Sequence, residues 1–274
     1  MGILSRSDAG VLSNADKSSV LSKAIAASMA NQLIDEGGYT FNTHKKLSGQ
    51  TLGKEFERAT MRFVRDTFPH LQHLRPGDWT VVQLGNNARL KTSDFAQYEH
   101  LAYLSELTKA NHELRASLGN DYVVAPDVVV YRALCLDDDI NAPREIVDER
   151  YATRADLRWM DDGKKPILHA SISAKFTMRS DRAQNSRTEA LGLIRNRKGC
   201  LPHIVVVTAE PMPNRIASLA LGTGDIDCMY HFALPELCEA VEQSGNEVAQ
   251  ETLDTLVFGK RLKDITDLPL DLAV

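Results

Sequence analysis

An aspartate and a lysine stand at the ends of two strand-like segments, and their types suit metal-assisted hydrolysis. Asp127 opens the β-branched run 127–131, and Lys175 closes the alternating segment 166–175. Ser173 and Lys175 share one face of that segment, because successive strand residues point to opposite sides. A carboxylate can hold Mg²⁺, which prefers oxygen ligands, and a lysine can stabilise a phosphate under attack or orient the attacking water. If the two strands are neighbours, the sequence predicts a metal site that cleaves phosphate esters.

A second carboxylate is available on the segment that follows. Residues 182–195 have helical periodicity, with Ser180 or Asp181 as the expected N-cap. Glu189 lies on this helix and can reach back to Lys175 if the helix packs beside the strand. The alternative is that Asp127, Lys175 and Glu189 are ordinary polar residues, since such short spacings also occur by chance.

The start of the same helix carries side chains that suit reading of G·C pairs. Arg179, Asp181 and Arg182 are separated only by Ser180. A guanidinium matches the O6 and N7 acceptors of guanine in the major groove, and an aspartate accepts from N4 of cytosine. The alternative is a capped helix with surface ion pairs. Next to a candidate metal site, we favour base recognition.

Charge is distributed unevenly along the chain. The formal net charge is −5, which by itself argues mildly against a nucleic-acid partner. A local excess of positive charge nevertheless indicates a surface that faces phosphates, although a solvated helix face would have the same composition. The excess lies in the stretch 175–198, which holds seven basic residues: Lys175, Arg179, Arg182, Arg187, Arg195, Arg197 and Lys198.

Strand-like and helical segments alternate, which predicts an α/β protein with a mixed sheet flanked by helices. Strict alternation in 166–175 places His169 on the same face as Ser171. The expected helices are 19–33, 52–68, 94–118, 182–195, 214–221 and 235–256, and the expected strands are 122–124, 127–131, 166–175, 203–208 and 227–234.

Bulk properties exclude several classes of protein. No apolar stretch is long enough to span a bilayer, and the first residues have no apolar signal core, so we expect a cytoplasmic protein. Four scattered cysteines form no CxxC pair, which argues against structural zinc and disulfide frameworks. No linker divides the chain, so we expect one domain over 1–274, with 1–20 as an N-terminal arm.

The combination of Asp127, Ser173-x-Lys175 and Glu189 resembles the PD-(D/E)xK nucleases, with one departure. Ser173 stands where the family usually has an acidic residue, and Glu189 would replace it from the helix. That relocation resembles the CCGG-cutting branch, the NgoMIV-like type II restriction endonucleases. The segments that carry the resemblance are HASISAKFTMRSDRAQNSRTEALGLIRNRKGCLPHIVVVTAEPMPNRIASLALGTGDIDCMYHFAL (169–234), HLRPGDW (73–79) and GKRLKDITDLPLDLAV (259–274). The resemblance extends from about residue 12 to the C-terminus and is weaker between 132 and 165.

The resemblance implies a fold and a reaction: a restriction-endonuclease-like core with a mixed five-stranded β-sheet flanked by α-helices. It also implies Mg²⁺-dependent cleavage of double-stranded DNA at a palindrome, G^CCGGC, that leaves 5′ CCGG overhangs. Two Mg²⁺ ions per active site and a homotetramer built as a dimer of dimers are further implications. The implied residues are Asp127 and Glu189 as metal ligands; Ser173, Lys175 and Glu57 as further catalytic residues; Arg179, Asp181 and Arg182 for the inner bases; and Gln50, Arg215 and Ser18 for the outer pair.

Two other functions stay open at this point. A DNA-binding protein without catalysis would keep Arg179, Asp181 and Arg182 but would not need Asp127 and Lys175. A structure-specific metal-dependent nuclease would keep the metal site but not the base-reading segment. Cutting at discrete CCGG-containing sites would distinguish both from a restriction endonuclease.

Overall fold

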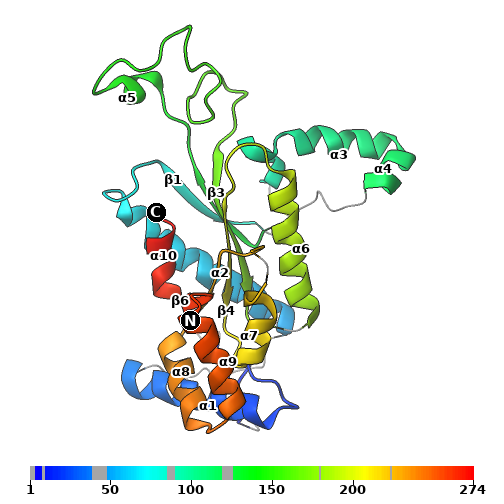
Figure 1. Cartoon of the computed structure of the whole chain (residues 1–274), viewed down its shortest axis with the longest axis vertical. Helices are drawn as coiled ribbons and strands as arrows, with labels where there is room; N and C mark the ends of the chain where they lie inside the picture. Colours follow the sequence, from blue (N-terminus) through cyan, green and yellow to red (C-terminus); the bar gives the residue numbers. More distant parts are fainter. Residues whose placement is uncertain are drawn as a thin grey trace.

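A mixed β-sheet forms the centre of the molecule in the computed structural model, which describes residues 4–7, 10–38, 48–84, 90–118, 126–178, 180–222 and 224–274 (Figure 1). Within these residues the strand order is β1-β2-β3-β4-β5-β6. The pairs β1–β2 and β2–β3 are antiparallel, and β3 to β6 are parallel. The strands are β1 (Trp79–Gln83), β2 (Val128–Arg132), β3 (Ile167–Lys175), β4 (His203–Thr208), β5 (Cys228–His231) and β6 (Leu262–Asp264).

Helices cover both faces of the sheet. The α-helices are α1 (Val20–Gly37), α2 (Gly49–Arg65), α3 (His100–Ala110), α4 (His112–Leu118), α5 (Asp137–Asn141), α6 (Ser180–Asn196), α7 (Pro213–Ala220), α8 (Leu234–Gln243), α9 (Glu247–Phe258) and α10 (Leu268–Asp271). Short 3₁₀ turns are η1 (Phe68–Leu71), η2 (Thr92–Asp94), η3 (Ala96–Tyr98) and η4 (Ile265–Asp267).

Alternating strand residues divide the core into two apolar clusters, one on each face of the sheet. One cluster joins Ile172 and Ala174 of β3 to α2, η1 and α10. The other joins Val206 of β4 and Met229 of β5 to α1, α3, α6, α7, α8 and α9. Ile172 and Ala174 therefore face away from α6, as their alternation with Ser173 and Lys175 predicts.

Strand direction brings several chain segments to one edge of the sheet. The parallel strands β3, β4 and β5 all end at this edge. Strand β2 runs the opposite way and begins there, with Val128 opposite Ile172, and β1 ends there, with Gln83 opposite Val128. Asp127, Lys175 and the segment that follows β4 are thereby gathered on one side of the molecule.

The structure confirms the α/β class and the helix-flanked mixed sheet, but its elements differ from the sequence expectations at their boundaries. The described sheet has six strands rather than five: β1 and β6 were not predicted, and only four of the five expected strands lie within the described residues. The stretch 94–118 is not one helix: it contains η3, α3 and α4, and Asn111 separates the two helices in extended backbone. The stretch 235–256 is divided into α8 and α9 at Gly245, whose φ of 63° is left-handed.

Two further boundary expectations are resolved differently. Ser180 and Asp181 are the first residues inside α6 rather than residues that precede it. The expected strand 122–124 lies outside the described residues. The first helix agrees well: Ser19 caps α1 through its side chain, and Gly38 ends it with φ 63°.

His169 lies on the opposite face from the one that strict alternation predicts. The pairing between β2 and β3 shifts register after Val130, which gives β3 one extra residue at 169. The His169 ring consequently packs against Phe68 and Trp79, and its Nε2 lies 2.8 Å from the carbonyl oxygen of Leu272. His169 is thus a core residue beside α10, and Ser171, Ser173 and Lys175 face the other side.

Described residues near both ends of the chain pack against the core, and the long β2–β3 connection extends away from it (Figure 1). Near the N-terminus, Leu12 is buried against α1 and the Asn14 side chain donates to the carbonyl oxygen of Ala209 at 3.0 Å. In the connection 133–166, the buried Arg158 guanidinium binds both carboxylate oxygens of Asp137, at 2.5 and 2.6 Å. Among the described residues, no helix has the length and apolar character needed to cross a bilayer.

Candidate active site

Asp127 and Lys175 are in direct contact at the edge of the sheet where β3, β4 and β5 end. Lys175 Nζ lies 2.8 Å from Asp127 Oδ2, and the backbone N–H of Ala174 donates to the same oxygen at 2.8 Å. The contact follows from the antiparallel β2–β3 pair, which puts the start of β2 beside the end of β3. Both hydrogen bonds use Oδ2, so within the described residues Oδ1 of Asp127 accepts none.

Helix α6 adds Glu189 to this pair. The helix is held against β3 by a hydrogen bond of 3.1 Å between the Ser173 and Ser186 hydroxyls, both buried. Burial, together with the charge of Asp127, raises the pKa of Glu189 to about 7, although Lys175 and the Ser173 hydroxyl act to lower it. These influences place Glu189 within electrostatic range of the Asp127–Lys175 pair.

Helix α2 contributes Glu57 from the other side of the sheet. Gln83, the last residue of β1, donates to Glu57 Oε2 at 2.9 Å. Burial raises the pKa of Glu57, and the charge of Asp127 raises it further, while the Gln83 hydrogen bond and Lys175 lower it. The structure thus brings all five expected residues (Asp127, Ser173, Lys175, Glu189 and Glu57) into one neighbourhood.

The donor set fits a hard divalent cation better than a soft one. Asp127, Glu57 and Glu189 supply only oxygen ligands, and a cation beside Asp127 would offset the repulsion that its charge exerts on the two glutamates. Among the described residues, no three Asp, Glu, His or Cys side chains converge closely enough to form a complete metal cage. Mg²⁺ does not need one, because it usually binds one or two carboxylates together with waters and substrate phosphate oxygens.

The residues expected to read the inner bases are only partly described. Arg179 lies outside the described residues, and the side chains of Asp181 and Arg182 are not described. Asp181 and Arg182 lie in the first turn of α6, which follows β3 in the chain.

Gln50 lies in the first turn of α2 rather than in a preceding loop, since Ser48 caps this helix. It is exposed. Glu57 lies two turns further along the same helix, so α2 connects the catalytic neighbourhood to an outer-base candidate.

Arg215 and Ser18 meet through an aspartate. Arg215, on α7, forms an ion pair with Asp16, and the Ser18 hydroxyl donates to Asp16 Oδ1 at 2.7 Å. The Ser18 hydrogen bonds and the Arg215 guanidinium hold the pKa of Asp16 well below its usual range. Arg215 Nη1 also lies 3.7 Å from the buried Glu210 carboxylate. Two outer-base candidates that are far apart in sequence are therefore neighbours.

The basic stretch 175–198 has two different environments. Lys175 is paired with Asp127, and Arg187 is paired with Asp225 at 3.5 Å, so these charges have partners inside the protein. Arg195, Arg197 and Lys198, at and after the end of α6, are exposed. The Lys198 amide donates to the Gln97 carbonyl oxygen, which places this end of α6 near the start of β3.

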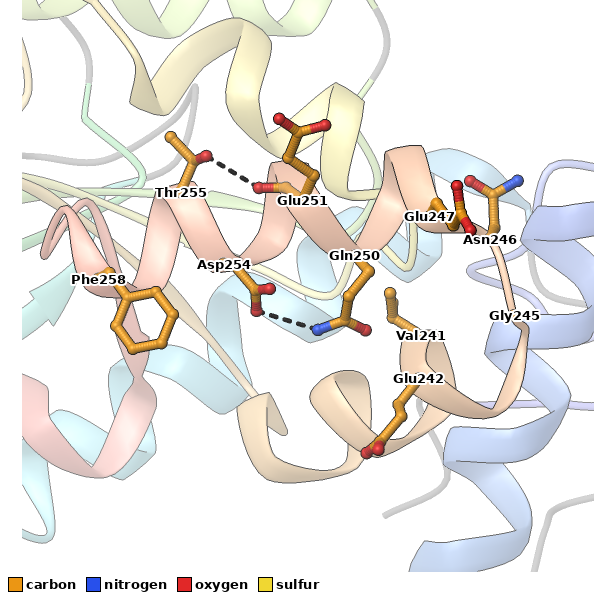
Figure 2. Close-up of a pocket in the computed structure, with 10 residues that line it drawn as sticks. All are labelled: Val241, Glu242, Gly245, Asn246, Glu247, Gln250, Glu251, Asp254, Thr255 and Phe258. Carbon is orange, nitrogen blue, oxygen red and sulfur yellow. Dashed lines mark hydrogen bonds between the residues drawn. The ribbon is translucent and has the colours of Figure 1, made fainter.

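A separate groove of about 690 Å³ between α8 and α9 is not suited to DNA (Figure 2). Four of the residues that line it are acidic: Glu242, Glu247, Glu251 and Asp254. Negative charge at this density repels a phosphate backbone, so the groove is not part of the candidate site.

Four residues of the site were not found from the sequence. Gln83 supports Glu57, Ser186 joins α6 to β3, and Asp16 and Glu210 flank Arg215. These residues are recognised by their contacts with other segments of the chain, which the sequence pattern does not show. Only Ser186 could have been found from its position, because it lies one helical turn before Glu189 and so on the same face of α6.

Comparison with known proteins identifies relatives of this chain. The Type II restriction enzyme NgoMIV of Neisseria gonorrhoeae is 52% identical over 272 residues, which is 99% of this chain and 93% of that enzyme. Among solved structures, the Type IIF restriction endonuclease Bse634I with cognate DNA is 14% identical and covers 82% of this chain and 85% of its own, with a TM-score of 0.40. Bse634I restriction endonuclease is 12% identical and covers 86% of each chain, also with a TM-score of 0.40.

The class of this protein is thereby defined: it is a type II restriction endonuclease. The family described as NgoMIV restriction enzyme matches residues 1–274, so the chain belongs to that family.

Proposed function

We propose that this protein cleaves double-stranded DNA at the palindrome G^CCGGC in a Mg²⁺-dependent reaction and leaves 5′ CCGG overhangs. The observation that carries the proposal is the contact between Asp127 and Lys175 at the end of β3, with Glu189 and Glu57 within electrostatic range of both. The 52% identity to a type II restriction enzyme along nearly the whole chain supports the same reaction.

Each side chain of the cluster has a defined task in this proposal. Asp127 and Glu189 would hold Mg²⁺, with two ions per active site. When bound, Mg²⁺ supplies Lewis-acid activation of the scissile phosphate and of the attacking water. Lys175 stabilises the negative charge that develops on the phosphate and orients the attacking water. Ser173 fixes α6 through Ser186 and keeps the Glu189 carboxyl in place.

Glu57 acts as a further acidic residue of the site. Gln83 orients its carboxylate, and the nearby Asp127 and Lys175 tune its charge. From this position Glu57 would support the second metal ion directly or through a water.

Specificity comes from separate segments. Arg179, Asp181 and Arg182 read the CCGG bases in the major groove, and Gln50, Arg215 and Ser18 read the outer G·C pair. A palindrome calls for a twofold arrangement of chains, and we propose a homotetramer that acts as a dimer of dimers. The chain works as a single domain over 1–274 in the cytoplasm of a prokaryote.

The decisive experiment is digestion of plasmid DNA that contains GCCGGC, with Mg²⁺ and with EDTA, followed by sequencing of the fragment ends. The Lys175→Ala variant tests the active site. Lys263→Ala is its matched control, because Lys263 is also a strand lysine paired with an aspartate, Asp271, at 2.6 Å.

We expect discrete cuts after the first G with wild type and Lys263→Ala, no cuts in EDTA, and a loss of at least about 10³-fold in rate with Lys175→Ala. Cuts at other CCGG sites would refute the outer-base assignment but would not contradict the active-site assignment. Intact DNA that is nevertheless bound would replace the nuclease with a binding protein, and cuts independent of CCGG would indicate a structure-specific nuclease.

A further inference from the structure

Glu210 is a fully buried carboxylate that follows β4, at the edge of the sheet where β3, β4 and β5 end. Its Oε2 accepts the backbone N–H of Met178 at 2.8 Å, and its Oε1 accepts the backbone N–H of Met212 at 3.2 Å. These two amides belong to different parts of the chain. One carboxylate therefore links two segments through its two separate oxygens.

The two linked segments are those that carry the base-reading residues. Met178 is the last residue before Arg179, and Met212 is the N-cap residue of α7, on which Arg215 lies one turn later. Arg215 is contacted from both sides, by Asp16 through an ion pair and by Glu210 across 3.7 Å. A change at Glu210 would therefore alter both the position of α7 and the environment of the Arg215 guanidinium.

Glu210 is also connected to the strand that carries Lys175. Its backbone N–H donates to the Thr208 hydroxyl at 3.2 Å, and that hydroxyl donates to the Lys175 carbonyl oxygen at 2.8 Å. These hydrogen bonds thus fix Lys175, Met178 and the start of α7 relative to one another.

Burying the Glu210 carboxylate destabilises the fold, because the charged group loses its hydration. Burial raises the pKa of Glu210 to about 7, and the amides of Met178 and Met212 and the Arg215 charge only partly offset that cost. An apolar residue would fill the space without the desolvation cost, but it could not bind both amides.

We propose that Glu210 is a positioning residue for site discrimination: by holding the Met178 and Met212 amides, it sets Arg215 relative to the inner-base segment and so determines how strictly the outer base pair is read. This inference rests on the proposed roles of Arg179 and Arg215. Glu210 touches no substrate in this role and acts through Arg215.

The test is the ratio of cleavage rates on GCCGGC and ACCGGT duplexes for wild type and Glu210→Gln. Glutamine has the same size but only one acceptor oxygen, so it can satisfy only one of the two amides. Asp264→Asn is the matched control, because the Asp264 carboxylate also spans two segments, with Oδ2 on the Leu234 amide at 2.9 Å and Oδ1 on the Thr266 amide at 3.0 Å, away from the base-reading residues.

We expect Glu210→Gln to lower the rate ratio about tenfold, a change typical of one weakened base contact, and Asp264→Asn to leave it unchanged. In an Arg215→Ala background, Glu210→Gln should lower the ratio no further. A ratio is measured on one preparation, so an inactive fraction of the protein cancels. If Glu210→Gln does not fold, Glu210→Asp replaces it, since the shorter side chain cannot reach both amides.

An unchanged rate ratio in folded Glu210→Gln would overturn the inference. An equal loss of the ratio in the wild-type and Arg215→Ala backgrounds would overturn it as well. If neither Glu210→Gln nor Glu210→Asp folds, Glu210 is a folding residue and the inference is also overturned. Failure of the proposed function is recognised separately, in wild type. If wild type prefers another outer pair, the ratio is measured on that pair. If it binds without cutting, the ratio of binding constants on the same two duplexes takes its place.

Discussion

At the scale of single residues, the candidate site is a crowded set of carboxylates around one lysine. Asp127 raises the pKa of both Glu57 and Glu189, so its charge opposes the ionisation of the two glutamates. Lys175 relieves part of this repulsion but cannot neutralise all three charges. A site of this kind is prepared for added positive charge, which agrees with the proposed Mg²⁺.

The Glu57–Gln83 hydrogen bond gives a pH-dependence that can be tested with Gln83→Leu. Gln83 lowers the pKa of Glu57 by stabilising its charged form, so removing the donor raises that pKa. Because the proposed role of Glu57 requires the carboxylate, the acidic limb of the pH–rate profile should move to higher pH. We expect cleavage to fall about tenfold or more at acidic pH, a loss typical of second-layer partners, and to recover at alkaline pH.

The matched control for this profile is Gln250→Leu. Gln250 donates to Asp254 at 2.9 Å on α9, which is the same type of contact far from the site. Its removal should leave the profile unchanged. A Gln83→Leu enzyme with a uniform loss at every pH would show that Gln83 supports the fold and does not set the charge of Glu57.

At the scale of elements, the extra residue in β3 connects the sheet to the C-terminal helix α10. His169 is buried by Phe68 and Trp79, and its Nε2–H donates to the carbonyl oxygen of Leu272. Burial lowers the pKa of His169 to about 4, against an ordinary value of about 6.5 in an unfolded chain. The neutral ring is therefore the form that the fold requires.

We predict that His169→Gln reduces the loss of stability in acid. The unfolded chain binds a proton at His169 near pH 6.5, whereas the folded chain binds it only near pH 4. The stabilisation is fully present above pH 6.5 and is lost as pH falls toward 4, by up to about 3 kcal/mol for this group. Glutamine keeps an N–H donor but does not titrate.

Urea unfolding at pH 7.5 and pH 5 measures this effect as the difference between the two free energies of unfolding. His70→Gln is the control, since His70 is exposed. The acid-dependent difference should be smaller in His169→Gln than in wild type and His70→Gln. Equal differences in all three proteins would refute the assignment of His169 as an acid-sensitive contact.

Sequence patterns predicted those elements whose signal is local. β3 and β4 have β-branched or alternating residues along their whole length, so they were found with their ends. The strands β1 and β6 are the two outermost strands of the sheet. Strand β6 has only three residues, too few for periodicity to distinguish it from a turn. The division between α8 and α9 depends on the left-handed Gly245, which a helical pattern with one glycine does not reveal.

The candidate site divides in the same way. Asp127 and Lys175 were found because each lies at the end of a recognisable strand, and Glu189 because its helix follows directly. Glu57 was found only through the family resemblance, since its place beside Asp127 depends on how α2 packs on the sheet. Glu210 has no distinctive sequence neighbours, and only its two backbone partners reveal it.

At the scale of the whole molecule, the net charge of −5 is distributed unevenly over the described residues. The exposed basic residues Arg195, Arg197 and Lys198 end α6, whereas the acidic groove lies between α8 and α9 (Figure 2). Phosphates are attracted to the first surface and repelled from the second, so the net charge alone is a poor guide to the partner.

The proposed dimer of dimers predicts that cleavage depends on the number of recognition sites in the DNA. Such an assembly holds two recognition sites together, so the second site on the same plasmid binds at a raised effective concentration. We expect a two-site GCCGGC plasmid to be cut about tenfold faster than a one-site plasmid at limiting DNA concentration. A short duplex that contains the site should restore the rate on the one-site plasmid, and a duplex without it should not. Sedimentation should then give four chains per particle. Equal rates on both plasmids, with two chains per particle, would mean that a dimer on one palindrome is the complete enzyme.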